Sequence, residues 1–244
     1  MDLVKVNANE PVLREAFQAR QPSNLRPIGR QAGFRRKQGS AMSAWLVRLF
    51  DIAISLMALL FLAPALILVG TIVTLQDGGP VFYGQNRIGR GGKEFKCFKF
   101  RSMSVDADAR LKRLLAEDPA ARAEWERDHK LRDDPRITRF GQFIRKTSLD
   151  EFPQLWNVLK GEMSLVGPRP IVRAEVIKYG RSFHKYTSVK PGITGLWQVA
   201  GRNDVTYFRR VAMDRLFARK RTVVIYLAIL CLTIPAVLLQ RGSY

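Results

Sequence analysis

The stretch IAISLMALLFLAPALILVGTIVTLQ, residues 52–76, is the strongest compositional signal in this sequence, because 25 consecutive residues carry no charge. Asp51 precedes the run and Asp77 follows it. About 20 apolar residues in a helix cross a hydrocarbon core of roughly 30 Å, so the run predicts a membrane helix. The buried helix of a soluble protein is the alternative interpretation.

Pro64 lies in the middle of this run, where a proline removes one helical hydrogen bond and crowds the preceding turn. We therefore expect the helix to kink there. Residues 1–43 contain eight basic and three acidic residues, and the chain from residue 77 onward contains 32 and 17. Basic flanks favour the cytoplasmic side of a membrane. A helix broken at Pro64 that re-enters the same face satisfies both flanks, whereas a kinked helix that spans the membrane is the alternative.

The charge of the whole chain points to an acidic partner. The 244 residues carry a net charge of +20, and 47% of them are hydrophobic, which suits one folded domain with a tail. Nucleic acid, an anionic membrane or a phosphorylated substrate would each fit this charge. Two cysteines and two histidines argue against a disulfide framework and a Cys/His zinc site. We expect Cys97 and Cys231 to act as small buried hydrophobes.

Short patterns predict an α+β fold, with a small and mostly helical cytosolic domain over residues 77–244. Residues 1–43 lack periodicity and predict a basic flexible tail, and residues 44–76 form the re-entrant membrane helix. Two β-rich runs, residues 81–83 and 95–100, are joined by glycine-rich residues 89–92 and predict a hairpin.

Helical patterns follow the predicted hairpin. Residues 104–131 predict a helix that is interrupted at residues 118–119, and residues 139–146 predict a short basic helix. A second uncharged run, residues 223–239, contains Pro235 and follows a basic cluster at residues 219–221. We prefer a C-terminal helix in the membrane interface to a second spanning helix.

The most informative polar stretch is TSLDEFPQLWNVLKG, residues 147–161. Ser148 and Glu151 fit a helix capping box, which by itself would explain the acids. Pro153 is tolerated only in a first helical turn, so we expect the helix to begin near Asp150. Asp150 and Glu151 at a positive helix end could then serve as a nucleophile and a magnesium ligand. The basic residues before them would keep Asp150 ionised.

Further cations stand in glycine- and proline-rich segments. Arg169 lies between two prolines in GPRP, residues 167–170, which would present its guanidinium rigidly to a phosphate. A surface arginine in a turn is the alternative. KPGITG, residues 190–195, and GRND, residues 201–204, predict tight turns in which glycines let the backbone approach a phosphate.

Four motifs together resemble the bacterial sugar transferase family, the monotopic phosphoglycosyl transferases. They are KCFKFRSM at residues 96–103, SLDEFPQL at 148–155, GPRP at 167–170 and KPGITG at 190–195. The resemblance runs from about Trp45 to the C-terminus and leaves residues 1–43 outside.

The resemblance implies an activity and a place in the cell. Such enzymes transfer a sugar 1-phosphate from a UDP-sugar to undecaprenyl phosphate and release UMP, which begins assembly of an exopolysaccharide repeat unit. They work on the cytoplasmic face of the bacterial inner membrane, among its lipids, and they need Mg²⁺.

The resemblance also implies roles for single residues. Asp150 would attack the sugar-proximal phosphate and form a covalent intermediate, and Glu151 would help to bind the metal. The phosphate-binding cations of the family fall on Lys99, Arg145, Arg169 and Arg202.

The sequence departs from the family pattern at two places. Ala63–Pro64 replaces the family's Ser-Pro pair at the helix break, so the serine hydroxyl that could bond to the backbone is missing. The basic, apolar C-terminal run is most similar to the exopolysaccharide-production ExoY-like branch, which implies galactose 1-phosphate, with glucose as the other candidate.

Two rival functions remain to be weighed. A nucleic-acid-binding module would explain the charge but not the uncharged run. A non-catalytic membrane scaffold or regulator of polysaccharide assembly would use the acids only as a helix cap. The sugar, the role of the tail and the oligomeric state, a homo-oligomer included, are left open by the sequence.

Overall fold

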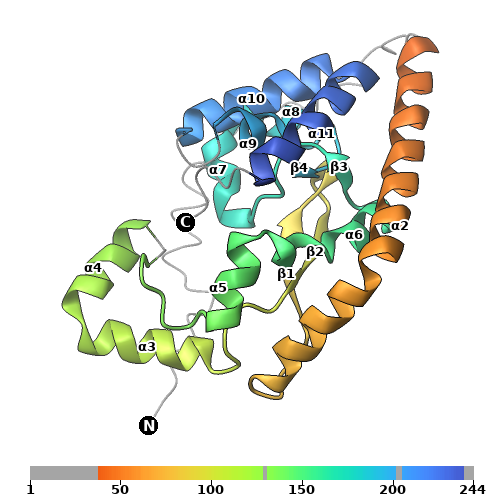
Figure 1. Cartoon of the computed structure of the whole chain (residues 1–244). Coiled ribbons are helices and arrows are strands. Elements are labelled where there is room, and N and C mark those ends of the chain that lie inside the picture. The colour runs from red at the N-terminus through yellow and green to blue at the C-terminus, as the bar shows by residue number, and fades with distance from the viewer. Residues whose placement is uncertain (1–37, 129–130, 202–204, 239–244) are drawn as a thin grey trace. The chain divides into compact units, whose positions relative to one another are not determined.

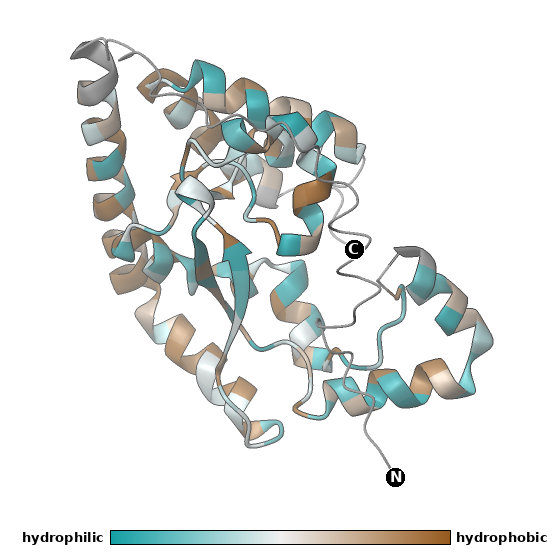
Figure 2. Cartoon of the chain, turned by 180° about the vertical axis from the view of Figure 1, so that it is seen from behind, coloured by the Kyte–Doolittle hydropathy of each residue, from teal (hydrophilic) through white to brown (hydrophobic). Residues whose placement is uncertain are grey.

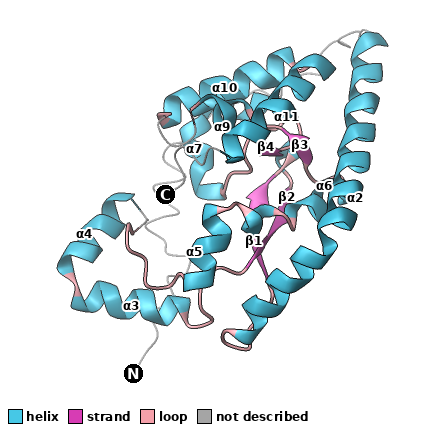
Figure 3. Cartoon of the chain, viewed as in Figure 1, coloured by secondary structure: helices cyan, strands magenta, loops and turns pink. Residues whose placement is uncertain are grey.

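The computed structural model describes residues 38–128, 131–201 and 205–238. These residues are mostly helical and contain a small β-hairpin, as the sequence predicted (Figure 3). The described residues from Gly39 onward belong to one compact unit. The expected basic tail lies outside the described residues except for its end, residues 38–43, which begins the first described helix. The domain boundaries expected from the sequence stay a prediction.

Helix α2 (Gln38–Leu75) contains the uncharged run and is continuous across Pro64. The break expected at Pro64 is therefore not confirmed, although the helix bends in its middle (Figures 1 and 2). Within the described part of the chain it alone is long and apolar enough to cross a membrane. Brown, hydrophobic stretches recur along its ribbon in Figure 2, and the side chains of Phe61 and Ile67 are 84% and 69% exposed. Such exposed apolar surface needs a cover other than water.

The predicted hairpin is confirmed. Strands β1 (Phe82–Ile88) and β2 (Glu94–Phe100) pair antiparallel, and the 3₁₀ turn η1 (Arg90–Gly92) joins them. Gly91 and Gly92 have φ values of 72° and 77°, the left-handed region that favours glycine. Helix α6 (Gln154–Lys160) packs on β2.

The helices after the hairpin follow the sequence pattern closely. Helix α3 (Ala107–Glu117) and helix α4 (Pro119–Asp128) are separated at Asp118, whose side chain accepts hydrogen bonds from the first amides of α4. Helix α5 (Arg139–Lys146) has the expected bounds, and Thr138 caps its N-terminus. Glycine in α5 is required by packing, because a Cβ at Gly141 would lie 1.9 Å from the Ser102 carbonyl oxygen.

A second, parallel sheet lies beside the hairpin and was not expected. Strands β3 (Ser164–Val166) and β4 (Gly192–Thr194) pair over three residues each. Residues 190–195 therefore enter a strand rather than the predicted tight turn. A Cβ at Gly192 would lie 2.0 Å from the Gly167 amide nitrogen, so the glycines are required by backbone packing.

The C-terminal half completes the core with short helical segments and two longer helices. These are η3 (Arg173–Glu175), α7 (Val176–Tyr179), η4 (Gly180–Ser182), α8 (Phe183–Tyr186), α9 (Leu196–Ala200), α10 (Tyr207–Lys220) and α11 (Val223–Leu238). Helix α11 corresponds to the second uncharged run. It buries Tyr226 and Ile229 in the main core, whereas Val224 and Ile234 are exposed. Cys97 is buried as expected, but Cys231 on α11 is exposed, contrary to expectation.

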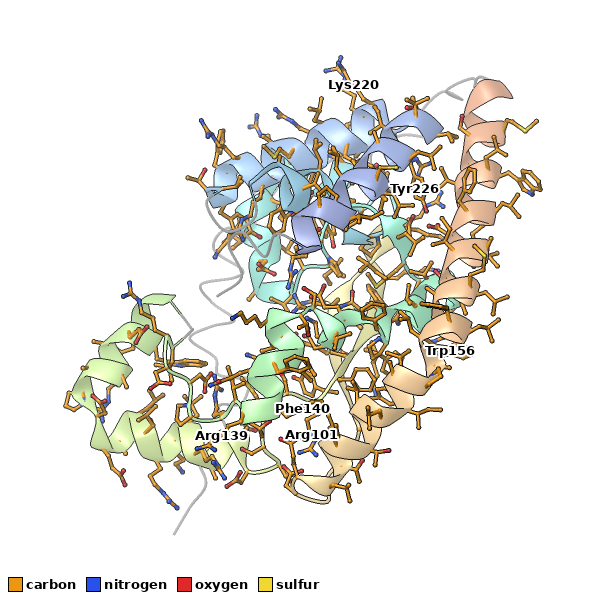
Figure 4. All side chains as sticks on the ribbon, in the orientation of Figure 1. Arg101, Arg139, Phe140, Trp156, Lys220 and Tyr226 are labelled. Atoms are coloured by element: carbon orange, nitrogen blue, oxygen red, sulfur yellow. The ribbon has the colours of Figure 1, made fainter. Side chains whose placement is uncertain are left out.

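Two polar residues of α2 fasten this helix to the rest of the fold. The Arg48 guanidinium donates to the carbonyl oxygens of Val158 and Leu159 at 2.6 and 2.8 Å, at the C-terminus of α6. Asp51 Oδ1 accepts hydrogen bonds from Ser164 Oγ, the Leu165 amide and Tyr226 Oη. Figure 4 shows Tyr226 on α11 beside α2. Asp51 therefore joins α2, β3 and α11.

Candidate active site

The two acids predicted as catalytic lie together around one lysine. Lys99 Nζ donates to Asp150 Oδ2 at 3.2 Å and to Glu151 Oε1 at 2.7 Å. Asp150 is 7% exposed. Charged side chains thus join β2 to the segment before α6. The sequence had predicted that Lys99, Asp150 and Glu151 belong to one site.

The acids do not start a regular α-helix, which corrects the sequence expectation. They lie in the 3₁₀ turn η2 (Leu149–Glu151), and α6 begins only at Gln154, with Pro153 as its N-cap. Ser148 adopts φ 59°, a left-handed conformation that is uncommon for a non-glycine residue. Its side chain makes no capping hydrogen bond, so the expected capping box is absent from η2. Strained backbone of this kind tends to occur at functional sites.

The predicted cations surround the acids to different degrees. Arg145 Nε donates to Ser102 Oγ at 2.8 Å, and its charge acts on Asp150. Arg169 Nη1 lies 3.7 Å from Glu151 Oε1, and its side chain is 41% exposed. Arg202 lies outside the described residues. The structure therefore brings together the acids, Lys99, Arg145 and Arg169.

A buried asparagine sets the register between Lys99 and the acids. Asn157 on α6 is fully buried. Its Oδ1 accepts from the Phe98 amide at 3.1 Å, and its Nδ2 donates to the Lys96 carbonyl oxygen and to Glu162, both at 2.7 Å. These bonds hold β2 against α6. Only the position of Asn157 within the acidic motif could have drawn attention to it from the sequence.

Arg87 is a further cation of the site that sequence reasoning missed. It lies on β1, where it donates to the Pro170 carbonyl oxygen at 3.0 Å and to Gln85 Oε1 at 2.6 Å. Tyr186 Oη donates to the Ile88 carbonyl oxygen at 2.8 Å and fastens the end of the same strand. Through its bond to the Pro170 carbonyl oxygen, Arg87 holds the proline-flanked segment that carries Arg169. The signal for it was weak, because one arginine in a strand has no motif.

The electrostatics of the two acids differ. Burial raises the pKa of Asp150 above its usual value, the charge of Glu151 adds to this, and Lys99 opposes it. Burial would also raise the pKa of Glu151, but the attraction of Lys99 and Arg169 outweighs it and lowers that pKa. The expected cations around Asp150 are present, yet burial prevails over them.

A small polar pocket lies beside these charges. It is lined by Gln85, Arg87, Cys97, Lys99, Glu151, Gln154, Arg169, Pro170, Gly192 and Ile193. Its enclosed volume is about 10 Å³, so a ligand larger than water has to lie across its mouth. Burial raises the pKa of the Cys97 thiol to about 11, which leaves it protonated at neutral pH. The thiol is therefore a poor nucleophile, and Asp150 is the stronger candidate.

The donor set suits magnesium better than zinc. Among the described residues no three His, Cys, Asp or Glu side chains form a metal-binding group. Magnesium typically takes only one or two protein carboxylates and fills its shell with water and substrate phosphates. The oxygens of Asp150 and Glu151 already converge on one cationic group, the Lys99 ammonium. The carboxylates therefore fit a magnesium ion that is shared with a phosphorylated substrate.

Comparison with known proteins gives the same relationship over most of the chain. The sequence model of the bacterial sugar transferase family matches residues 42–240. The undecaprenyl-phosphate galactose phosphotransferase of Salmonella typhimurium is 54% identical over 202 residues, which cover 83% of this chain and 42% of that protein. The exopolysaccharide production protein ExoY of Sinorhizobium fredii is 48% identical over 197 residues, which cover 81% and 87%.

A more distant relative has a different sugar in its name. The undecaprenyl-phosphate glucose phosphotransferase of Komagataeibacter xylinus is 39% identical over 210 residues, covering 81% of this chain and 36% of that protein. The chain thus spans less than half of the length of the two phosphotransferases and most of the length of ExoY. The match to ExoY supports the ExoY-like branch expected from the sequence. By the family match and these identities, the chain belongs to the bacterial sugar transferase family.

Proposed function

We propose that this protein transfers a sugar 1-phosphate from a UDP-sugar to undecaprenyl phosphate, as the first step of exopolysaccharide repeat-unit assembly. The observation that carries the proposal is the contact of Lys99 Nζ with both Asp150 and Glu151, beside Arg145 and Arg169. Carboxylates held among cations suit a reaction in which every substrate is an anion. The names of the relatives favour galactose, with glucose as the second candidate.

The first half of the reaction forms a covalent intermediate. An Asp150 carboxylate oxygen attacks the sugar-proximal phosphorus of the UDP-sugar, and the bond from that phosphorus to the bridging oxygen breaks. UMP leaves with the electron pair, and the phosphosugar stays on Asp150 as an acyl phosphate. Lys99, Arg145 and Arg169 neutralise the charge that develops on the phosphate oxygens.

The second half restores the enzyme. A phosphate oxygen of undecaprenyl phosphate attacks the same phosphorus, and the bond to Asp150 breaks and returns its carboxylate. Magnesium held by Glu151 and the substrate phosphates would supply further charge neutralisation. The raised pKa of Asp150 suits this cycle, because a more basic carboxylate is a better nucleophile once it is ionised.

A non-catalytic scaffold explains these acids less well. In that function the acids would only cap a helix, yet Ser148 makes no capping bond and Glu151 faces Lys99 and Arg169. Both carboxylates thus contact Lys99, a cation that lines the small pocket. This arrangement favours catalysis over scaffolding.

The test measures UMP release from UDP-galactose and UDP-glucose by the purified full chain, with magnesium and undecaprenyl phosphate present. We expect Asp150→Asn to lose activity at least about 10³-fold, since it removes the nucleophile. Intact-mass measurement should find a phosphosugar adduct on the parent protein and none on this variant. Asp133→Asn, at an exposed loop position, is the matched control and should keep full activity. Full activity in Asp150→Asn would contradict the mechanism.

We also propose that α2 enters the bacterial inner membrane and returns to the cytoplasmic face, with α11 in the interface. The bend of α2 and its exposed apolar surface support this path. The basic residues on both sides of the helix support one face. A tag at residue 43 and a tag at the C-terminus should both be labelled only from the cytoplasm, and labelling from opposite faces would show a full span.

A further inference from the structure

A large apolar groove lies between the second half of α2, the hairpin and the start of α6. Its volume is about 930 Å³, at the upper end of the range for ligand pockets. Its walls include Ala63 and Gly70 of α2, Phe82, Phe98 and Phe100 of the hairpin, and Trp156 of α6. Figure 4 shows Trp156 beside α2, and its side chain is 56% exposed. The proposed reaction at Asp150 does not itself use this groove.

The walls of the groove carry few side-chain hydrogen-bond donors, namely two threonine hydroxyls and the indole N–H of Trp156. The two hydroxyls on its α2 wall belong to Thr71 and Thr74. They donate within the helix, to the carbonyl oxygens of Ile67 at 3.0 Å and Gly70 at 3.1 Å. A nucleotide or an extended peptide needs polar partners, because burying its polar groups without them is costly. One indole N–H cannot satisfy an extended polar ligand, so an apolar chain fits this groove better.

The groove and the polar pocket share a wall. Side chains alternate along β2, so Lys99 lines the polar pocket, whereas Phe98 and Phe100 line the groove. The segment from η2 to the start of α6 also faces both, since Glu151 and Gln154 line the pocket and Pro153 lines the groove. Strand β2 thus separates cations that could bind a phosphate from a surface that could bind a hydrocarbon chain. The ligand that matches both is an anionic head joined directly to an apolar chain.

We propose that the groove binds the isoprenoid chain of the polyprenyl phosphate acceptor, namely the isoprene units nearest its phosphate. This inference rests on the proposed function, because it names the part of the lipid substrate that the groove holds. A bilayer phospholipid fits less well, since it places two ester groups between its phosphate and its chains, and the indole N–H of Trp156 cannot satisfy both. The rest of a long chain stays in the membrane beside α2.

The test compares one substitution on two faces of α2. Ala63 lines the groove, whereas Ala65 is exposed and does not line it. We expect Ala63→Trp to fill the groove and to raise the KM for undecaprenyl phosphate at least about tenfold, since buried apolar contact is lost. The KM for the UDP-sugar and UMP release in a single turnover without lipid should not change. Ala65→Trp should change none of these.

A binding measurement separates the groove from the reaction. A polyprenyl phosphate with a photoreactive group on its chain should label peptides from α2 and the hairpin in the parent and in Ala65→Trp, and much less in Ala63→Trp. Excess phosphatidylglycerol should not displace this label. Equal labelling of the two variants, or displacement by phosphatidylglycerol, would overturn the groove assignment.

Failure of the groove and failure of the proposed function give different results. Turnover without labelling of the groove would overturn only the groove, and labelling without any turnover would contradict only the transferase activity. If Ala63→Trp does not fold, Thr71→Trp in the groove and Leu68→Trp on the exposed face repeat the comparison. Melting temperatures of all variants should match that of the parent.

Discussion

Asp51 and Asp150 are both buried, with 2% and 7% of their surface exposed, but their partners differ in kind. Asp51 Oδ1 accepts three hydrogen bonds from uncharged donors on β3 and α11, each between 2.8 and 2.9 Å. Asp150 accepts one bond from a charged side chain, Lys99, and stands next to a second carboxylate. Its other cation, Arg145, bonds to Ser102 instead.

The difference separates a structural carboxylate from a reactive one. Asp51 Oδ1 is held by three donors from two elements, β3 and α11, so moving it would break all three hydrogen bonds. The carboxylate of Asp150 is bonded to the flexible side chain of Lys99 and not to a backbone amide or a hydroxyl. The cations around it could therefore bind an anionic substrate as well. The same residue type thus serves stability at one position and chemistry at the other, and the partners decide which.

Lys99→Gln tests the reactive side of this comparison and should have a larger effect than the changes at Asp51 and Asp214. It removes the cation that both acids share, so we expect turnover to fall about 100- to 1,000-fold, the range for losing one group that stabilises developing charge. Steady-state UMP release measures this. Lys96→Gln, an exposed position on the same strand, should leave turnover unchanged. Normal turnover in Lys99→Gln would show that the ion pair between Lys99 and Asp150 does not contribute to catalysis.

Asp51→Ala tests the structural side. It leaves the Leu165 amide and the hydroxyls of Ser164 and Tyr226 without their acceptor, and we expect a loss of about 3 kcal/mol of unfolding free energy. Thermal or denaturant unfolding in detergent measures it. Tyr226→Phe removes only one of the three donors and should cost about 1 kcal/mol. Activity per folded molecule should persist in both variants, and its loss at unchanged stability would place Asp51 in the chemistry.

Asp214 is a third buried aspartate, and it should show the smallest effect, as a dependence on pH. Burial raises its pKa to about 7, and it accepts a hydrogen bond from Tyr179 at 2.7 Å. Because the folded state holds this proton more tightly than the unfolded state, stability falls as pH rises from about 4 to 7. Between pH 6 and 8 the loss is about 1 kcal/mol.

Asp214→Asn keeps an acceptor for Tyr179 but cannot ionise, so this pH dependence should disappear. Between pH 6 and pH 8, melting curves should show the unfolding free energy of the variant rising by about 1 kcal/mol relative to that of the parent. Asp108→Asn on α3 is the control, and its difference from the parent should be the same at both pH values. A constant difference for Asp214→Asn as well would mean that Asp214 does not titrate between pH 6 and pH 8.

The parts of the fold that depend on local sequence were predictable. The hairpin followed from glycines between two β-rich runs, and α5 followed from its basic pattern with the bounds Arg139–Lys146. The acids and Lys99 could be placed in one site because their motifs resemble those of the bacterial sugar transferase family. Local composition misled at residues 190–195, where proline and glycines predict a turn, because the contact of Gly192 with Gly167 decides the strand.

The rest depends on contacts between distant segments. Nothing near Arg87 in the sequence shows that its guanidinium holds the Pro170 carbonyl, and nothing near Asn157 shows that it bonds to β2. The start of α6 also escaped, because Ser148 takes a left-handed conformation and the acids form a 3₁₀ turn. These features arise from tertiary packing, which outweighs local preference.

The two polar contacts of α2 have a mechanical consequence. Arg48 and Asp51 are three residues apart, so they lie on the same side of one helical turn. Arg48 grips the end of α6 and Asp51 grips β3, and two attachments at one turn stop the helix from sliding along its axis or rolling about it. These attachments therefore fix the distance between the acids and the apolar surface of α2.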